Sequence, residues 1–330
     1  MKVAVTGANG HVGVNLCDAL IRQGHQVRAL THQHNEFLSG IPVEQIRGDV
    51  MDPESLRTFM EGIDTVFHLA ARISITGDRD GSVWKINAEG TRNMVEAARA
   101  SGVRRFIHFS SIHAFSQQPH DQVLDETRPL VGNGGFAYDR SKATGERIVK
   151  EAAANGFNAV IVSPTAIIGP ADPQPSLTGK AVLALIHRQI PALVHGGYNW
   201  VDVRDIVDGA IMASERGVKG EKYLLSGTWC SLPELSAMIA RLSGAKTPTS
   251  VMPFWLARVG LPFITAYSKV TGSEPLYTGE SLTIITEGSR MISNEKARKE
   301  LNFHPRNLEI TIGDLIHWFE EKGLINKHEK

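Results

Sequence analysis

Short apolar runs alternate with helical patterns through the first half of this 330-residue chain, and this alternation limits its fold more than any other feature. The apolar runs that predict strands are residues 2–6, 26–30, 43–48, 65–70, 105–110 and 158–162, and the helical patterns cover 12–23, 53–60, 87–101 and 138–155. Strands and helices that alternate at this spacing form a parallel sheet with helices on both faces. The sequence therefore predicts an α/β fold with a doubly wound parallel sheet.

A glycine-rich loop joins the first expected strand to the first expected helix. Its glycines are spaced three and three, whereas the commonest dinucleotide fingerprint has its first two glycines only two apart. Glycines let the chain turn sharply and approach a pyrophosphate without a Cβ in the way, and the helix N-terminus offers N–H groups to phosphates. We therefore expect a dinucleotide site of the Rossmann type rather than a purely structural turn. The loop residues that would hold the phosphates are Gly7, Asn9, Gly10, His11, Val12 and Gly13.

The end of the second expected strand bears on the choice between NAD and NADP. In NAD enzymes an acidic residue about 20 residues after the loop holds the ribose 2′-hydroxyl. Here Thr31 and His32 follow the strand, and no carboxylate occurs until Glu36. The sequence therefore favours NADP, with NAD as the alternative, and Arg28, His32 or His34 could approach a 2′-phosphate. A metal site on the two histidines is less favoured than a solvated loop, because no third ligand lies nearby.

Tyr138 and Lys142 are four residues apart in an expected helix, so their side chains leave the same face. A phenol ordinarily has a pKa of about 10, and a neighbouring ammonium group favours the phenolate. A tyrosine placed in this way could exchange a proton with a carbonyl or alcohol oxygen. The spacing often arises by chance on exposed helix faces, so the pair indicates a catalytic role only in combination with the glycine loop.

The pattern changes after Pro164, where prolines and glycines make an irregular stretch and helical segments then dominate. Two later runs, at 200–203 and 222–226, look like returns to the sheet. We expect a dinucleotide-binding domain at 1–168 with returning segments near 198–228. Segments 169–197 and 229–330 would then form a smaller, discontinuous, mainly helical substrate-binding lobe.

Together these motifs resemble the extended short-chain dehydrogenase/reductase family, the NAD-dependent epimerase/dehydratase superfamily, over nearly the whole chain. The resemblance implies that Asp49 and Val50 lie near the adenine and that Ser111 is the catalytic serine. It further implies that Asn87 is the family's structural asparagine. The residues that would pass or pack on the nicotinamide and its ribose are Leu69, Ala70, Ala71, Pro164 and Ile167.

The resemblance also implies the catalytic roles. Tyr138 would donate a proton to the developing alkoxide, and Lys142 would stabilise the phenolate and hydrogen-bond the nicotinamide ribose. Ser111 would donate a hydrogen bond to the carbonyl oxygen, and Asn87 would hold a backbone carbonyl or a water behind Lys142. Purely structural alternatives are a strand-end cap for Ser111 and a helix cap for Asn87. His113 is better interpreted as a substrate-lining or packed residue than as a second acid.

The motifs at 223–227 and 291–297 are most similar to the dihydroflavonol-4-reductase-like branch. We expect an oxidoreductase that reduces a ketone or aldehyde of a small, partly apolar substrate. The alternatives are a nucleotide-sugar epimerase or dehydratase with retained NAD, and a catalytically silent dinucleotide binder, which the intact tetrad argues against. His195, Tyr198 and Arg204 flank the segment that faces substrate in this family. The family's usual dimer, a four-helix bundle, would use residues 87–101 and 138–155.

The composition argues against several other classes of protein. Lys plus Arg equals Asp plus Glu at 35 each, so no net charge favours nucleic acid. Cys17 and Cys230 form no disulfide framework, and the chain opens on a strand rather than an export signal, so we expect a cytoplasmic protein. The most apolar stretch, 251–267, contains Arg258 and two prolines and is too short to span a membrane. It should form an apolar helix pair lining a pocket, with a membrane-surface patch as the alternative.

Overall fold

The computed structural model of the chain describes residues 1–32, 36–261 and 277–325. A seven-stranded sheet forms the larger lobe, with the strand order β10-β6-β5-β4-β1-β2-β3. Every neighbouring pair in it is parallel, which confirms the predicted doubly wound architecture. Its strands are β1 (Lys2–Thr6), β2 (Gln26–Thr31), β3 (Glu44–Arg47), β4 (Thr65–His68), β5 (Arg105–Phe109), β6 (Ala159–Pro164) and β10 (Lys222–Leu225).

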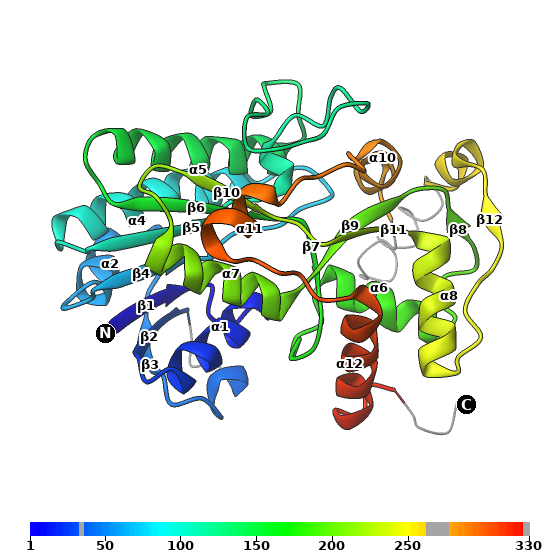
Figure 1. Cartoon of the computed structure of the whole chain (residues 1–330), viewed down its shortest axis with the longest axis horizontal. Helices are drawn as coiled ribbons and strands as arrows, with labels where there is room; N and C mark the ends of the chain where they lie inside the picture. The colour runs from blue at the N-terminus through cyan, green and yellow to red at the C-terminus, as the bar shows by residue number, and fades with distance from the viewer. Residues whose placement is uncertain (33–35, 262–276, 326–330) are drawn as a thin grey trace.

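Helices cover both faces of this sheet, because alternate residues of the buried strands point to opposite sides (Figure 1). Val3 and Val5 of β1 pack in one core, and Ala4 packs in the other. The first core is covered by α1 (His11–Arg22), α7 (Val203–Arg216) and α11 (Glu295–Leu301). The second is covered by α2 (Pro53–Phe59), α4 (Gly90–Ala100) and α5 (Ala137–Ala154).

The second lobe contains two small sheets and helices that pack on them (Figure 1). One sheet has the order β11-β9-β7, and the other pairs β12 with β8. The strands are β7 (Ala166–Ile168), β8 (Leu193–Val194), β9 (Gly197–Asp202), β11 (Thr228–Ser231) and β12 (Val251–Met252). Its helices include α6 (Leu177–Ile186), α8 (Leu232–Ser243), α10 (Gly279–Glu287) and α12 (Leu308–Glu321), and residues 254–261 are also helical.

The segment at 200–203 does not return to the large sheet, and this corrects the sequence interpretation. Its residues Trp200 and Val201 lie in β9, which pairs with β7 in parallel and with β11 in antiparallel fashion. Because β7 follows β6 after only Thr165, the chain leaves the large sheet there, three residues before the expected boundary at 168. The run at 222–226 does return, since β10 pairs with β6.

The expected helix at 87–101 begins earlier and less regularly than its pattern predicts. A short helix α3 (Ser82–Trp84) runs into a π-helical turn η2 (Lys85–Glu89) before α4 begins. Two 3₁₀ turns, η1 (Glu36–Leu38) and η3 (Ile112–Ala114), complete the elements used below. No helix of the described ranges is both long and apolar enough to cross a membrane. Of the apolar stretch 251–267, residues 262–267 lie outside those ranges.

Candidate active site

The glycine loop after β1 is packed so closely that a side chain on Gly7 or Gly13 would collide with the protein backbone. Gly7 has a left-handed φ of +67°, and a Cβ there would lie 2.9 Å from the backbone of Leu69 and Ala70. A Cβ on Gly13 would lie 2.1 Å from the Gly7 carbonyl oxygen. Gly10 precedes α1 and offers no side-chain cap, so the first N–H groups of α1 have no side-chain acceptor from it. The loop therefore fits the pyrophosphate of a dinucleotide.

A cavity of about 2230 Å³ begins at this loop and reaches into the second lobe. Ordinary small-molecule sites measure roughly 300–1,000 Å³, so the space suits a dinucleotide together with a substrate. The structure brings all the predicted cofactor and catalytic residues except Asn87 to its wall. These residues are Gly7, Asn9, Gly10, His11, Val12, Gly13, Thr31, His32, Asp49, Val50, Leu69, Ala70, Ala71, Ser111, Tyr138, Lys142, Pro164 and Ile167.

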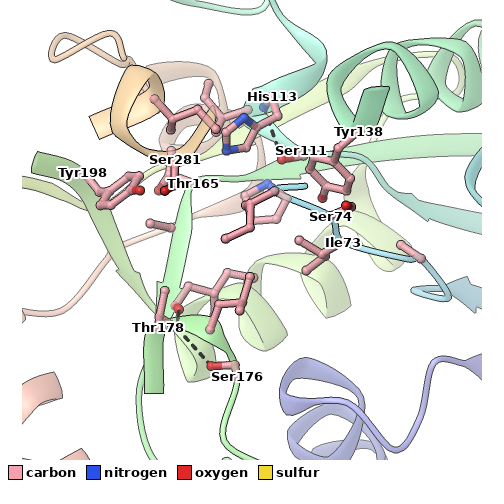
Figure 2. A pocket seen from close by; sticks show the side chains of 18 of the residues that line it. Ile73, Ser74, Ser111, His113, Tyr138, Thr165, Ser176, Thr178, Tyr198 and Ser281 are labelled. Carbon is pink, nitrogen blue, oxygen red and sulfur yellow. Dashed lines mark hydrogen bonds between the residues drawn. The ribbon is translucent and has the colours of Figure 1, made fainter. Parts of the chain in front are cut away.

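Ser111 and Tyr138 lie side by side on the wall of this cavity (Figure 2). Ser111 follows the carboxyl end of β5, and its hydroxyl accepts the His113 backbone N–H at 3.2 Å. Tyr138 is the second residue of α5. Burial raises the pKa of the Tyr138 phenol to about 12, although its hydrogen bond with Ser111 lowers that pKa. At neutral pH the phenol therefore keeps the proton that a reduction would require.

Lys142 lies one turn along α5, and its ammonium group donates a 2.5 Å hydrogen bond to the Phe109 carbonyl oxygen. Burial lowers the pKa of Lys142 to about 8, against the raising effect of Glu146. The raised pKa of Tyr138 differs from the expectation that Lys142 makes the phenol more acidic. The physical reason is that burial of the phenol outweighs its neighbours, and Lys142 points to the end of β5.

A second layer of buried polar groups lies behind Lys142. Glu146 is fully buried, accepts a 2.9 Å hydrogen bond from the Ser110 hydroxyl, and pairs with Lys222 Nζ at 3.2 Å. Burial and the charge of Lys142 lower the pKa of His68 to about 3 and that of His108 well below its ordinary value. Both imidazoles are therefore neutral at pH 7, whereas Lys142 keeps its charge.

Asn87 lies outside the cavity wall, in the π-helical turn η2. Its side chain accepts the Arg72 N–H at 2.7 Å and donates to the Arg72 carbonyl at 3.0 Å and to the Ser141 hydroxyl at 2.9 Å. It thus ties the segment after β4 to α5, next to Lys142. In this structure Asn87 is a positioning residue for the segment that passes the cavity, and it does not cap the helix.

At the far end of the cavity, His32 Nδ1 lies 3.8 Å from Asp49 Oδ2. Asp49 also accepts the Met51 N–H at 2.8 Å, which holds the loop after β3 in place. Arg28 is not available to a ligand, which corrects the expectation that it could approach a 2′-phosphate. It pairs with Glu44 at 2.8 Å and donates to the carbonyls of Phe59 and Glu61 on the far side of β2. His34 lies outside the described residues.

The sequence interpretation missed many residues of the wall, among them the carboxylates Asp139 and Glu280. Asp139 directly follows Tyr138, so its position gave a signal, whereas Glu280 arrives from α10 with no local signal. Tyr198 lines the wall, as the resemblance implied for its segment. Arg204 is instead held by Asp202 and Asp314, each at 2.7 Å. His195 is exposed and is not among the lining residues.

The fold and this cavity define an NAD(P)-dependent enzyme of the oxidoreductase class, with a Rossmann sheet under a tyrosine–lysine centre. The chain belongs to the NAD dependent epimerase/dehydratase family, whose model matches residues 3–226. This is the extended short-chain dehydrogenase/reductase family that the motifs resemble.

The similar proteins include reductases. The chain is 33% identical to sterol demethylase protein B of Methylococcus capsulatus, over 98% of this chain and 100% of that protein. It is also 33% identical to a Synechocystis protein named after dihydroflavonol 4-reductase, over 97% of this chain and 95% of that protein. The crystal structure of gox2253 superposes with a TM-score of 0.85 at 31% identity, covering 98% of this chain and 99% of the other. A MoeE5 structure with UDP-glucose and NAD, at 21% identity and a TM-score of 0.77, covers 98% and 99% and shares the fold.

Proposed function

We propose that this protein is an NADP-dependent reductase that converts a ketone or aldehyde of a small, partly apolar substrate into an alcohol. The observation that carries the proposal is the neutral Tyr138 phenol beside the Ser111 hydroxyl. Both groups lie next to the part of the cavity that reaches into the second lobe, which is largely apolar and is called the chamber below. A protonated phenol next to a second hydroxyl donor is the pair of groups that a developing alkoxide needs.

The residues have distinct roles in this reaction. The nicotinamide cofactor supplies the hydride when it is bound along the glycine loop. Ser111 donates a hydrogen bond to the carbonyl oxygen, where negative charge develops. Tyr138 donates its proton to the same oxygen. Lys142, charged at neutral pH because its pKa is about 8, stabilises the phenolate that remains.

The chamber beyond Tyr138 supports an apolar substrate. Its wall includes the apolar residues Val182, Leu185, Ile190, Leu193, Leu235, Met252, Leu282 and Ile285. Among the described residues, the wall contains no arginine that could hold a nucleotide diphosphate bidentately. The names of two relatives, 2-alkyl-3-oxoalkanoate reductase and 3-beta-hydroxysteroid dehydrogenase, also describe oxo or hydroxy groups on carbon skeletons.

The preference for NADP rests on the end of β2. Thr31 and His32 occupy the place where an acidic residue would hold a ribose 2′-hydroxyl. The His32 side chain is 76% exposed and lies on the cavity wall, so its imidazole can donate to a 2′-phosphate.

The proposal is tested by titrating the purified protein with NADPH and NADH, and then following cofactor absorbance with a panel of ketones and aldehydes. We expect tighter binding of NADPH and its consumption by apolar ketones. A protein that purifies with bound NAD and interconverts nucleotide sugars without net cofactor consumption would instead be an epimerase. Binding of dinucleotide with no turnover across the panel would indicate a silent binder.

We also propose a homodimer through α4 and α5, the two helices that the family resemblance assigns to a four-helix bundle. Light scattering of the purified protein tests this, and a monomeric mass at micromolar concentration would contradict it.

A further inference from the structure

A buried aspartate behind the glycine loop has no role in the mechanism above. Asp172 lies between β7 and α6, and only 1% of it is exposed. Its Oδ2 accepts the Ser176 backbone N–H at 2.8 Å and the Ser176 hydroxyl at 2.7 Å, which fixes the start of α6. Its Oδ1 is also buried, and no group of the described residues donates a hydrogen bond to it. One oxygen of this carboxyl group therefore lacks the partner that a buried charge requires.

His11 is the ionisable side chain that faces Asp172. It is the first residue of α1 and lies in the cavity wall, whereas Asp172 is not one of the described residues of that wall. The His11 side chain is 7% exposed, and its Nδ1 lies 3.9 Å from Asp172 Oδ2. That distance is too long for a hydrogen bond but short enough for two charges to attract each other. The imidazole thus lies between the carboxylate and a ligand on the glycine loop.

The second ring nitrogen of His11 decides which form of the imidazole fits. Its Nε2 lies 3.0 Å from the Pro170 carbonyl oxygen, which can only accept, so Nε2 must carry a hydrogen. In the neutral ring, Nδ1 would then present a lone pair to the Asp172 carboxylate. In the imidazolium both nitrogens carry hydrogens, and both face oxygen acceptors. The contacts of His11 therefore suit the imidazolium better than the neutral ring.

The start of α1 opposes this charge, because the amino end of a helix carries a partial positive charge. The other charged groups on α1, on α6 and at the start of α7 are Asp18, Arg22, Lys180, Asp202, Arg204, Asp205 and Asp208. Each of these aspartates is paired with an arginine, so Asp172 is the carboxylate that acts on His11. A second anion beside His11 would shift the balance towards the imidazolium, and a pyrophosphate on the glycine loop is such an anion.

We propose that a bound dinucleotide draws a proton from solvent onto His11, so that an imidazolium held by Asp172 faces the pyrophosphate. The inference concerns the cofactor alone, so it applies equally to a reductase and to an epimerase. Residues 7–13 contain no lysine or arginine. His11 therefore supplies a full positive charge where the loop otherwise offers N–H groups. Cofactor affinity increases as the pH falls.

Calorimetric titration of the full chain with NAD⁺ and NADP⁺ at pH 7, in two buffers of different ionisation enthalpy, measures the protons taken up. We expect roughly half a proton per cofactor for the wild type and far less for His11→Gln. Asp172→Asn, a neutral residue of the same shape, should also lose most of the uptake. His304→Gln removes an exposed histidine that contacts Asn302 and is the matched control. Between pH 6 and 8 the wild-type Kd should rise about tenfold, the effect of one charge-assisted hydrogen bond, and that of His11→Gln much less.

NAD⁺ lacks the 2′-phosphate, so its titration distinguishes His11 from His32. Uptake with NADP⁺ but none with NAD⁺ would overturn the proposal, because the proton would then belong to the 2′-phosphate end. This result needs no variant. Equal uptake by the wild type and His11→Gln would also overturn it. If Asp172→Asn lowers the melting temperature but keeps the uptake, Asp172 only caps α6 and the partnership with His11 is refuted.

The NMR signal of the His11 ring gives a second readout. The signal is assigned by its loss in His11→Gln, and it should move to the imidazolium position when NAD⁺ is added at pH 7. A signal that keeps the neutral position in the complex would refute the proposal. Failure of both dinucleotides to bind would instead refute the cofactor assignment itself, on which this inference depends.

Discussion

The ammonium group of Lys142 donates a 2.5 Å hydrogen bond to the carbonyl oxygen of Phe109, the last residue of β5. Ser111 follows that residue by two positions, so this one bond joins the helix that carries Tyr138 to the strand end that carries Ser111. The buried Lys142 ammonium group therefore helps to fix the position of the Tyr138 phenol relative to the Ser111 hydroxyl.

The Tyr138→Phe variant tests the proton donor. Removing the phenol hydroxyl should lower kcat about 10²–10⁴-fold, because positioned acids contribute that much, and should leave NADPH affinity unchanged. Steady-state kinetics and a fluorescence titration measure the two effects. Tyr198→Phe removes a phenol from the same wall and should cost far less. Near-normal turnover of Tyr138→Phe would refute the mechanism.

The Lys142→Met variant should lose activity and change how stability depends on pH. The folded-state pKa of Lys142 is about 8, below the usual 10.5, so the unfolded chain binds an extra proton between these values. The charged side chain thus costs stability below pH 8, and this cost is relieved as pH rises. Between pH 7 and 9.5 the wild type should gain about 2 kcal/mol relative to the variant. Urea unfolding at both pH values measures this, and a constant difference would show that Lys142 keeps an ordinary pKa.

The Gly13→Ala variant should abolish dinucleotide binding. Its Cβ would lie 2.1 Å from the Gly7 carbonyl oxygen, so the loop must open and lose its fit to a pyrophosphate. Gly313→Ala is the matched control, because Gly313 lies inside α12 with no atom within 4 Å of the added Cβ. That change should stabilise the protein by up to about 1 kcal/mol and leave cofactor affinity intact. Calorimetric titration with NADPH distinguishes the two, and tight binding by Gly13→Ala would disprove the proposed role of the loop.

The Glu146→Gln variant should destabilise the protein by about 3 kcal/mol. The change leaves Lys222 buried without its charged partner, which is more costly than removing both. The double variant Glu146→Gln, Lys222→Met should recover part of the loss in chemical denaturation. An additive double variant would show that the pair is not coupled.

Local patterns predicted the fold well because a parallel sheet covered on both faces needs continuous apolar strands. The glycine loop and the Tyr138–Lys142 pair were also visible, since each is defined by spacing within one segment. The expectation for residues 200–203 was wrong because the pairing of β9 with β7 depends on a turn of the chain at Thr165, which no local pattern specifies. Arg28 was misjudged because its partner Glu44 lies on another strand.

The sequence by itself determined the class of fold, the strand–loop–helix that suits a dinucleotide, and the helix that carries the phenol and the ammonium group. Only the tertiary structure decided the electrostatics of the Tyr138 phenol and the Lys142 ammonium group. Burial raises the pKa of Tyr138, and the packing of α5 on β5 places Lys142 where it donates to the Phe109 carbonyl. Tertiary structure also brought Glu280 of α10 to the same cavity wall as His113 and Asp139, because these residues come from segments far apart in the sequence.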